Sequence, residues 1–344
     1  MRYGFRINQF LRLRQSGLQK YLDNSPLIYD EVLGIYDPAT PLQDNFDNNS
    51  SVFRTYSNLE PRLNISYNFQ NKSIKASYNR LNQYLHLISN TSSPTPLDIW
   101  VPSGPYIKPQ KLDQFALGYY TKVKEVKLES EVFYKKIKNR LDYIDGADLV
   151  ANDNIETVIL PGISRAYGME LLLRKNSGRH KYWIAYTLSK SEQKTPGRNS
   201  NENGINMSKW YNTPYDKTHD FSINSEYNIN KKLKIVGNFI FQTGQPTNYP
   251  NSQYNYMNLN VPNYGERNSQ RLPNYHRLDI NLTLTPNRNN KKIESSWVFG
   301  IYNIYDRDNA SSIIFRRNNE TLKNEAVQIS IFGIVPSVTY NFKF

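Results

Sequence analysis

The sequence predicts an all-β protein, a transmembrane antiparallel up-and-down β-barrel wall of about 12 strands. Three observations predict it. Apolar and polar residues alternate along many segments, which places them on opposite faces of a strand. Many of these segments run for about 10 residues or more, the length of a tilted strand that crosses a bilayer. Short and long connections also alternate along the chain, and outer-membrane barrels have short turns on one side and long loops on the other.

Four segments show the alternation most clearly, each with one apolar and one polar face. They are residues 63–69, 220–229, 277–285 and 337–344. In the last of them Val338, Tyr340, Phe342 and Phe344 share one face, and polar residues separate them. Eight further segments follow the same rule less strictly: 2–13, 73–86, 112–122, 125–143, 165–175, 179–192, 231–242 and 293–305.

The connections between these segments fall into two classes. The short ones are 71–72, 123–124, 176–178, 230 and 286–292. The long ones are 15–52, 87–111, 144–164, 193–216, 243–274 and 306–332. Long loops without secondary structure are uncommon in compact soluble domains. Their regular recurrence therefore favours a barrel whose loops all lie at one end.

Composition excludes several classes of protein. Hydrophobic residues make up 38% of the chain, and no stretch approaches the roughly 18 to 20 apolar residues of a spanning helix, so a helical membrane protein is excluded. There is no cysteine, which excludes disulfide scaffolds, cysteine-ligated metals and cysteine nucleophiles. The four histidines, His86, His180, His219 and His276, are never three or four residues apart. We therefore expect no metal site and no cofactor.

The net charge is +13, which raises the question of a nucleic-acid partner. The densest basic stretches, 135–140 and 288–292, are short and lie at the ends of strand-like segments. They contain no regular interleaving of aromatic residues, so we expect no binding of nucleic acid. A basic soluble β-domain that binds carbohydrate or nucleic acid is the weaker alternative, because a soluble β-sandwich also has one apolar face per strand. The strand lengths and the aromatic residues near the strand ends favour the membrane.

Several short segments together resemble the C-terminal part of the β-barrel of a TonB-dependent outer-membrane receptor of the Bacteroidetes type. They are LEPR at 59–62, GMELLLRK at 168–175, YTLSK at 186–190, YDKTHD at 215–220, FQTGQP at 241–246, YHRLD at 275–279 and GIYNIY at 300–305. The final segment, PSVTYNFKF at 336–344, is similar to the last strand of that family. No single segment is specific, but they occur in the family's order.

The resemblance implies that residues 1–344 are one barrel portion in the outer membrane of a Gram-negative bacterium, part of a barrel of 22 strands. We expect the chain to lack the signal peptide, TonB box and plug domain of intact relatives. The expected partners are outer-membrane lipid, an unidentified nutrient ligand and, only where the missing N-terminal part is present, a plug and TonB. The implied function is TonB-dependent uptake of a scarce nutrient, such as a siderophore, an oligosaccharide or a peptide.

The alternative function is a self-contained passive outer-membrane pore or a surface adhesin. Closure between the strand at 2–13 and the strand at 337–344 would favour that alternative. We do not expect an enzyme. His219 precedes Asp220, and adjacent residues of a strand point to opposite faces, which separates the only His-Asp neighbours from each other.

Two sets of candidate site residues follow. Asp220, Glu226, Arg277 and Asp279 lie on the polar faces of their strands, so we expect them to face the lumen. Four tyrosines lie in the long connection 243–274, where aromatic side chains could stack on sugars or aromatic siderophores. These expected ligand contacts are Tyr249, Tyr254, Tyr256 and Tyr264.

Overall fold

The computed structural model describes most of the chain: residues 1–13, 19–42, 52–89, 98–148, 152, 154–257, 259–286, 294–318, 320 and 324–343. Within these ranges the regular secondary structure is almost entirely β-strand. Its helices are three single 3₁₀ turns, η1 (Leu22–Asn24), η2 (Ile155–Val158) and η3 (Ile205–Ser208). No helix in the described part of the chain is both long enough and apolar enough to cross a membrane.

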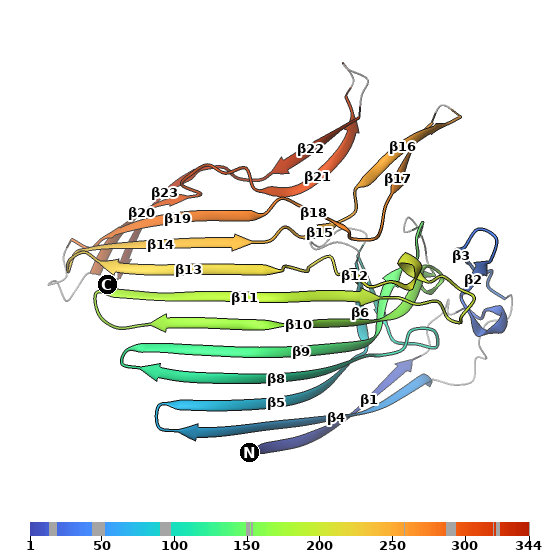
Figure 1. The fold of residues 1–344 in the computed structure, drawn as a ribbon, viewed down its shortest axis with the longest axis horizontal. Helices are drawn as coiled ribbons and strands as arrows, with labels where there is room; N and C mark the ends of the chain where they lie inside the picture. Colours follow the sequence, from blue (N-terminus) through green and yellow to red (C-terminus); the bar gives the residue numbers. More distant parts are fainter. Residues whose placement is uncertain are drawn as a thin grey trace.

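One antiparallel sheet forms the body of the molecule (Figure 1). Its strands follow one another in chain order, each paired with the next long strand. They are β1 (Arg2–Leu13), β4 (Val52–Phe69), β5 (Lys72–Gln83), β8 (Gln110–Val123), β9 (Val126–Tyr143), β10 (Ile159–Lys175), β11 (His180–Lys194), β13 (His219–Asn228), β14 (Leu233–Gln242), β19 (Tyr275–Leu284), β20 (Glu294–Tyr302) and β23 (Val335–Lys343). The short strand β12 (Tyr211–Asn212) pairs with the end of β11.

The long strands confirm the predicted antiparallel up-and-down arrangement. Each of the twelve predicted segments overlaps one of the twelve long strands. The strand that was predicted at 63–69 already begins at Val52, and the one predicted at 165–175 already begins at Ile159. Its first residues, Val52 to Ser57, do not alternate between apolar and polar, which hid them from the sequence analysis. Phe344, expected on the apolar face of the last strand, lies outside the described residues.

The register of the ladders keeps apolar residues on one face from strand to strand. Leu282 of β19 lies opposite Ile235 of β14 and Phe299 of β20. The next residue, Thr283, lies opposite Lys234 and Val298 on the other face. Because side chains alternate along a strand, a shift of one residue would exchange the two faces, so this register fixes an apolar and a mainly polar side.

The tight turns lie at one end of the sheet and the long connections at the other (Figure 1). The long connections contain more structure than the sequence predicts, because four of them form five small two-stranded ladders, two of these in the connection 243–274. These are β2 (Leu27–Asp30) with β3 (Ile35–Pro38), β6 (Leu85–Ile88) with β7 (Ile99–Pro102), β15 (Pro246–Thr247) with β18 (Gln270–Arg271), β16 (Pro250–Tyr256) with β17 (Leu259–Tyr264), and β21 (Ala310–Arg317) with β22 (Asn324–Ser330).

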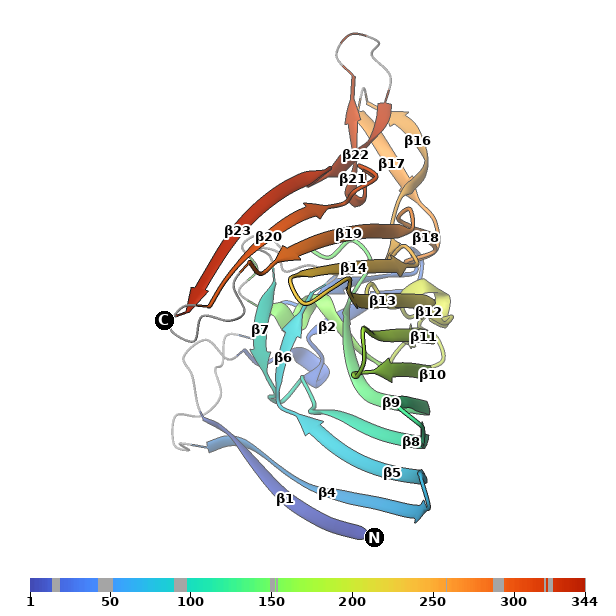
Figure 2. The same cartoon turned by 90° about the vertical axis from the view of Figure 1, so that its left-hand side faces the viewer.

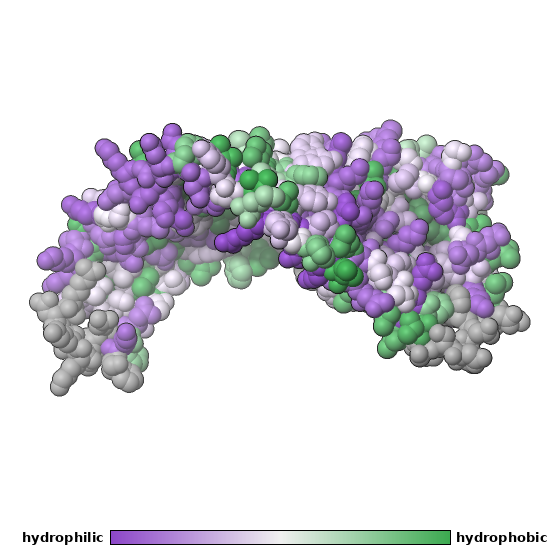
Figure 3. Space-filling model, turned by 90° about the horizontal axis from the view of Figure 1, so that it is seen from below, coloured by the Kyte–Doolittle hydropathy of each residue, from purple (hydrophilic) through white to green (hydrophobic). Residues whose placement is uncertain are grey.

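The sheet is curved into an arch (Figure 2). β1 and β23 are the two ends of the strand order, and they lie at opposite edges of the arch. In space-filling representation the molecule is hollowed on one side (Figure 3). No pairing between β1 and β23 is recorded for the residues that the structure describes.

The apolar core lies among the long connections, beyond the wall. Its buried side chains come from β2, β3, β6, the loop ends of β9 and β10, η2, η3, β12 and the connections next to β8 and β9; they are Leu27, Tyr36, Ile88, Ile107, Leu141, Tyr143, Ile144, Ile155, Val158, Ile159, Leu160, Ile205 and Tyr211. By contrast, apolar side chains on the wall itself are exposed, as at Phe5 (74%) and Phe115 (52%). The wall therefore presents an apolar face that no part of the described chain covers.

Aromatic residues gather on the apolar face near both ends of the strands. Toward the loops, Tyr78 packs against Phe115 and Tyr134 against Tyr167, with ring centroids 4.8 and 6.5 Å apart. Near the turns, Trp297 packs against Tyr340 at 4.6 Å. Two such belts are typical of the membrane–water interfaces of outer-membrane barrels.

Candidate functional site

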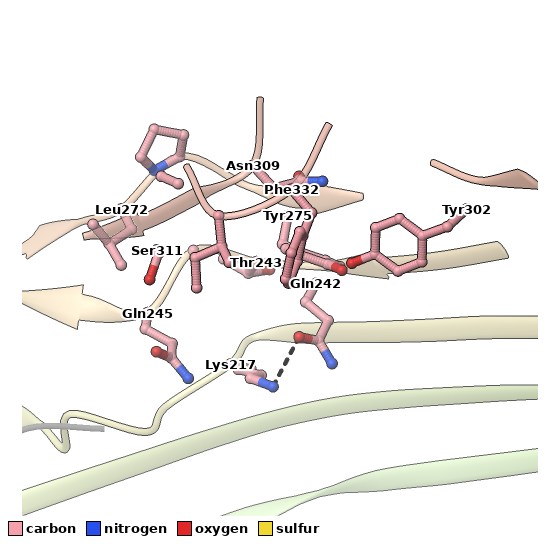
Figure 4. A pocket seen from close by; sticks show the side chains of 14 residues that line it. Lys217, Gln242, Thr243, Gln245, Leu272, Tyr275, Tyr302, Asn309, Ser311 and Phe332 are labelled. Carbon is pink, nitrogen blue, oxygen red and sulfur yellow. Dashed lines mark hydrogen bonds between the residues drawn. The ribbon is translucent and has the colours of Figure 1, made fainter. Parts of the chain in front are cut away.

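A cavity of about 350 Å³ lies where β13, β14, β19 and β20 end on the loop side (Figure 4). Its polar lining residues are Lys217, Gln242, Thr243, Gln245, Tyr275, Tyr302, Asn309 and Ser311. Leu272, Ile331 and Phe332 add apolar surface. Such a lining suits a small molecule, or part of a larger one, that has both polar groups and an apolar face.

Lys217, Gln242 and Asp220 form a chain of polar contacts at this cavity. Lys217 Nζ donates to Gln242 Oε1 at 2.9 Å, the contact drawn in Figure 4. Gln242 Nε2 donates to Asp220 Oδ2 at 2.9 Å, and the Lys217 ammonium lies 3.9 Å from the same carboxylate oxygen. The Gln242 amide is therefore held from both ends, and Asp220 balances the charge of Lys217.

Arg277 holds the two tyrosines that line the cavity. Its Nη1 donates to Tyr275 Oη at 2.9 Å and to Tyr302 Oη at 2.6 Å, and its guanidinium lies 4.0 Å from the centroid of the Tyr302 ring. Asp279 pairs with Arg277 at 2.9 Å and accepts the Asn303 backbone N–H at 2.9 Å. Neither charged residue lines the cavity, but together they fix its aromatic wall.

The structure brings three of the four predicted lumen residues to one end of the sheet and leaves the fourth apart. Asp220, Arg277 and Asp279 contact the residues that line the cavity or their neighbours. Glu226 lies farther along β13 toward the turns, where it pairs with Lys181 at 3.0 Å and with Lys234 at 3.4 Å. It belongs to a separate ion-pair cluster.

The buried carboxylate of Asp216 holds the loop beside the cavity in place through a hydrogen bond and an ion pair. Asp216 is 1% exposed, accepts the Ser191 backbone N–H at 2.6 Å and forms an ion pair with Arg271. Arg271 Nη1 also donates to the Gly244 carbonyl at 2.9 Å. A Cβ atom at Gly244 would lie 1.6 Å from the Leu272 carbonyl oxygen, so only glycine permits this close approach of the two loop strands.

The four predicted tyrosines fall into two groups. Tyr254, Tyr256 and Tyr264 lie on the β16–β17 hairpin and are 57%, 59% and 57% exposed. Tyr249 precedes the hairpin and packs its ring 5.4 Å from Phe315 of β21. Its hydroxyl is buried and makes no hydrogen bond to any described residue. Three of the four are therefore open to solvent, and the fourth joins two hairpins.

A second cavity, of about 740 Å³, lies among three long connections. Its lining includes Tyr143, Asp145, Asn206, Asn248, Tyr264 and Arg267. Arg267 pairs with Asp142 at 2.9 Å and with Asp145 at 2.8 Å. Tyr211 Oη donates to Asp142 at 2.6 Å, and burial together with this carboxylate raises the pKa of Tyr211 well above its usual value. These bonds fix three loops relative to one another.

Sequence analysis missed the residues that line the first cavity, among them Lys217, Gln242, Tyr275 and Tyr302. A signal for them was present. They lie in four of the segments that resemble one receptor family, 215–220, 241–246, 275–279 and 300–305. The pairing of β13, β14, β19 and β20 brings these segments together, so their common feature is a shared location at the loop ends of adjacent strands.

The described residues contain no cluster of three or more potential metal-ligating side chains. The two histidines at strand starts bond to tyrosines. His219 Nδ1 lies 2.9 Å from Tyr186 Oη, and His276 Nδ1 lies 2.9 Å from Tyr305 Oη. These contacts place both rings among the aromatic residues of the wall.

The loop core contains one titratable group that makes it sensitive to acid. His86 is fully buried, with Nε2 2.9 Å from Ser103 Oγ and Nδ1 3.2 Å from Gln110 Nε2. Burial, aided by the charge of Arg140, lowers the pKa of His86 to about 4. Because the ordinary pKa is about 6.5, the burial of neutral His86 costs no stability above that pH, and the fold loses stability progressively as the pH falls from about 6.5 to about 4.

We expect the β6–β7 hairpin to lose about 3 kcal/mol of local stability between pH 7 and pH 4. Hydrogen-exchange protection factors for its amides measure the loss. The matched variant is His86→Gln, which cannot gain the charge. The hypothesis fails if the hairpin of that variant loosens in acid as much as that of the original protein.

A family model described as "TonB dependent receptor-like, beta-barrel" matches residues 35–304. A search of curated proteins finds no match. Solved structures that resemble the chain include three receptors. The siderophore receptor PiuA of Acinetobacter baumannii is 15% identical, with a TM-score of 0.55, 86% of this chain covered and 38% of that one. The ferric yersiniabactin uptake receptor FyuA of Yersinia pestis is 13% identical, with a TM-score of 0.53 and 90% and 41% covered.

The third is the ferric-catecholate import receptor Fiu of E. coli K12, 17% identical, with a TM-score of 0.52, 89% of this chain covered and 37% of that one. At these identities the likeness concerns the fold. The chain spans less than half the length of each of the three receptors.

Proposed function

The chain belongs to the TonB-dependent receptor β-barrel family, and from this premise we propose that it forms part of an outer-membrane receptor for a scarce nutrient. It is a wall of a transmembrane β-barrel in the Gram-negative outer membrane, and lipid contacts its apolar face. The proposed role is capture of a siderophore, an oligosaccharide or a peptide at the loop end, followed by TonB-dependent uptake. The similar receptors are named for import and uptake of ferric complexes.

The cavity between β13, β14, β19 and β20 is the observation that supports this function best. It lies at the loop end, where a solute arrives from outside, and it combines a cation, amides and tyrosines with apolar surface. The Asp216–Arg271 ion pair, with its bonds to neighbouring backbone, and the Arg277 cluster hold its walls before any ligand binds. A site that is already ordered loses little conformational entropy when it binds.

The polar face of the wall would continue the path inward. We assign Asp220, Glu226, Arg277 and Asp279 to this lumen face. Asp220, Arg277 and Asp279 lie near the loop end of the wall, which we call the mouth. The exposed tyrosines Tyr254, Tyr256 and Tyr264 would contact the ligand first, and Tyr249 would support their hairpin from behind.

Among the described residues, β1 and β23 each have a strand partner on one side only, which supports completion of the wall by further strands. In hydrocarbon, each unpaired backbone N–H or C=O costs several kcal/mol, so a barrel in lipid must close. Additional strands, to a total of about 22, would close this arch and leave room for a plug domain that couples to TonB. These partners belong to the proposal.

Ligand binding by the purified chain in detergent tests the proposal. The probes are a ferric catecholate, a ferric hydroxamate, a maltooligosaccharide and an oligopeptide mixture. Quenching of the intrinsic fluorescence of the protein measures the binding of each probe. One class is expected to bind saturably. The double variant Lys217→Ala with Gln245→Ala should bind it about tenfold more weakly, because two polar contacts are removed.

The matched control is Lys72→Ala with Asn68→Ala, two exposed residues at the turn end. Its affinity should equal that of the original protein. Ion conductance across a planar bilayer with no saturable binding of any probe would indicate the passive pore and overturn the receptor function. Equal weakening in both double variants would remove the cavity from the proposal.

A further inference from the structure

The short turns carry an excess of positive charge at the end of the sheet that lies opposite the long connections (Figure 1). Exposed basic side chains recur at the turns that join β4 to β5, β8 to β9, β10 to β11 and β13 to β14. We call them the turn cations: Lys72, Lys122, Lys124, Lys127, Arg179, Lys231 and Lys232. No ion pair between any of them and another described residue is recorded.

The carboxylates nearest to these turns are already paired with other residues. Glu125 pairs with Lys175 at 3.4 Å, and Glu129 pairs with Arg174 at 3.3 Å. Glu226 belongs to the ion-pair cluster described above. The described part of the chain therefore leaves the turn cations without an ion-pair partner of their own.

Two of the turn cations lie directly opposite each other. The register pairs Lys122 of β8 with Lys127 of β9 on the polar face of the wall. Arg174 of β10 follows in the same row, and it is the residue that takes up Glu129. Like charges at directly opposed positions destabilise a sheet. The wall therefore bears an electrostatic cost at this lysine pair, and a bound anion would offset that cost.

A cavity of about 260 Å³ opens beside the lysine pair, and we call it the lysine-pair cavity. Besides Lys122 and Lys127, its lining includes Lys72, Asn68 and Gln70. Ammonium groups form strong hydrogen bonds to carboxylates. The amide side chains of Asn68 and Gln70 can both donate to and accept from peptide groups. This combination suits a short piece of peptide that carries a carboxylate.

The turn cations continue beyond this cavity along the curve of the sheet. From the β4–β5 turn to the β13–β14 turn the sheet spans about 30 Å, at about 4.8 Å per strand. Lys122 and Lys127 lie on the polar face, and Lys231 and Lys232 lie in a turn, so contact with membrane lipid does not account for them. A ligand that repeats its carboxylates can contact several turns at once and gains affinity from each contact. A polymer therefore fits this arrangement better than a single small anion.

We propose that the turn cations bind the acidic stem peptides of the cell-wall polymer, with the lysine-pair cavity as the principal site. The short turns of outer-membrane barrels face the periplasm, where the cell wall lies beneath the membrane. That polymer is a glycan whose stem peptides carry free carboxylates at intervals, which matches both the charge and the spread of the turn cations. Binding holds the receptor against the wall and does not involve the cavity at the loop end.

Co-sedimentation of the purified chain, in a nonionic detergent, with isolated cell-wall sacculi tests the proposal. The probes are intact sacculi, sacculi whose carboxylates have been converted to amides, and sacculi stripped of their stem peptides. The chain should sediment with the intact sacculi and remain in solution with the other two. Lys122→Gln with Lys127→Gln should weaken binding about fivefold, because two ion pairs are lost, and added salt should weaken it by screening.

The same double variant removes a repulsion within the wall, so its unfolding temperature should not fall. A second variant, Lys231→Gln with Lys232→Gln, tests the polymer at a distant turn. It should bind intact sacculi several-fold more weakly but bind a released stem peptide as the original protein does. Unchanged binding of sacculi by this variant would indicate a site for one anion and overturn the polymer as ligand.

The matched control is Lys136→Gln with Lys138→Gln, which removes two exposed lysines of β9 at the loop end. The net charge changes equally, and binding should equal that of the original protein. The proposal is wrong if this control loses as much binding as the Lys122 and Lys127 variant, or if amidated sacculi bind as well as intact ones. It is also wrong if the chain binds phosphatidylglycerol vesicles through the same lysines and ignores sacculi. Each of these results is independent of the nutrient that the receptor captures.

Discussion

Arginine in place of Leu282 is expected to lower the free energy of unfolding in lipid by about 1–3 kcal/mol, between the cost at the bilayer midplane and that at its interfaces. Leu282 lies two residues before the turn-side end of β19, opposite Ile235 and Phe299 on the face that contacts lipid. A guanidinium there must enter hydrocarbon or draw water and head groups toward it, and both cost free energy. Urea titration of the chain folded into phospholipid vesicles measures the change.

Thr283→Arg is the matched control. Thr283 is the next residue along the same strand and lies on the opposite face, beside Lys234 and Val298. Its arginine can reach water, so the loss should be much smaller, with only a minor repulsion from Lys234. Equal losses at the two positions would contradict the assignment of the faces.

Alanine in place of Asp216 is expected to loosen the loop that borders the cavity by about 3 kcal/mol. The change leaves the Ser191 backbone N–H without its acceptor and Arg271 without its carboxylate. The Arg271 side chain is 28% exposed, so water can solvate part of its unpaired charge in the variant. The expected loss of stability is therefore at the lower end of the range for buried ion pairs. Amide exchange over residues 213–218 and 243–247 measures the loss.

Asp216→Asn separates the two contributions. The amide oxygen can still accept the Ser191 N–H but carries no charge for Arg271, so an intermediate loss is expected. Residues in the middle of β10 and β11 should keep their protection in both variants. If the alanine variant leaves the exchange of 243–247 unchanged, Asp216 does not hold the loop.

The wall could be predicted from the sequence because its information is local. Alternation in 220–229 or 277–285 needs only neighbouring residues, and it fixes which side of a strand meets an apolar solvent. The order of the strands follows from the tight turns, such as that between Phe69 and Lys72, since an antiparallel neighbour is the only partner that so short a turn allows.

The site could not be predicted to the same extent because its information is distributed. Lys217 and Gln242 become neighbours only through the register between β13 and β14. Gly244 appears in the sequence as one of 16 glycines, and its requirement follows only from the approach of Leu272. The hairpins of the long connections are short, and weak alternation over a few polar residues did not distinguish them from irregular loops.

The core among the long connections gives the molecule two regions with different solvents. The wall is stabilised by contact of its apolar face with hydrocarbon. The mouth is stabilised in the way a water-soluble domain is, by a buried apolar core from which water is excluded. The shape of the mouth is therefore decoupled from the thickness and fluidity of the bilayer. A receptor built in this way can keep the same recognition geometry while the lipids around it change with temperature or growth conditions.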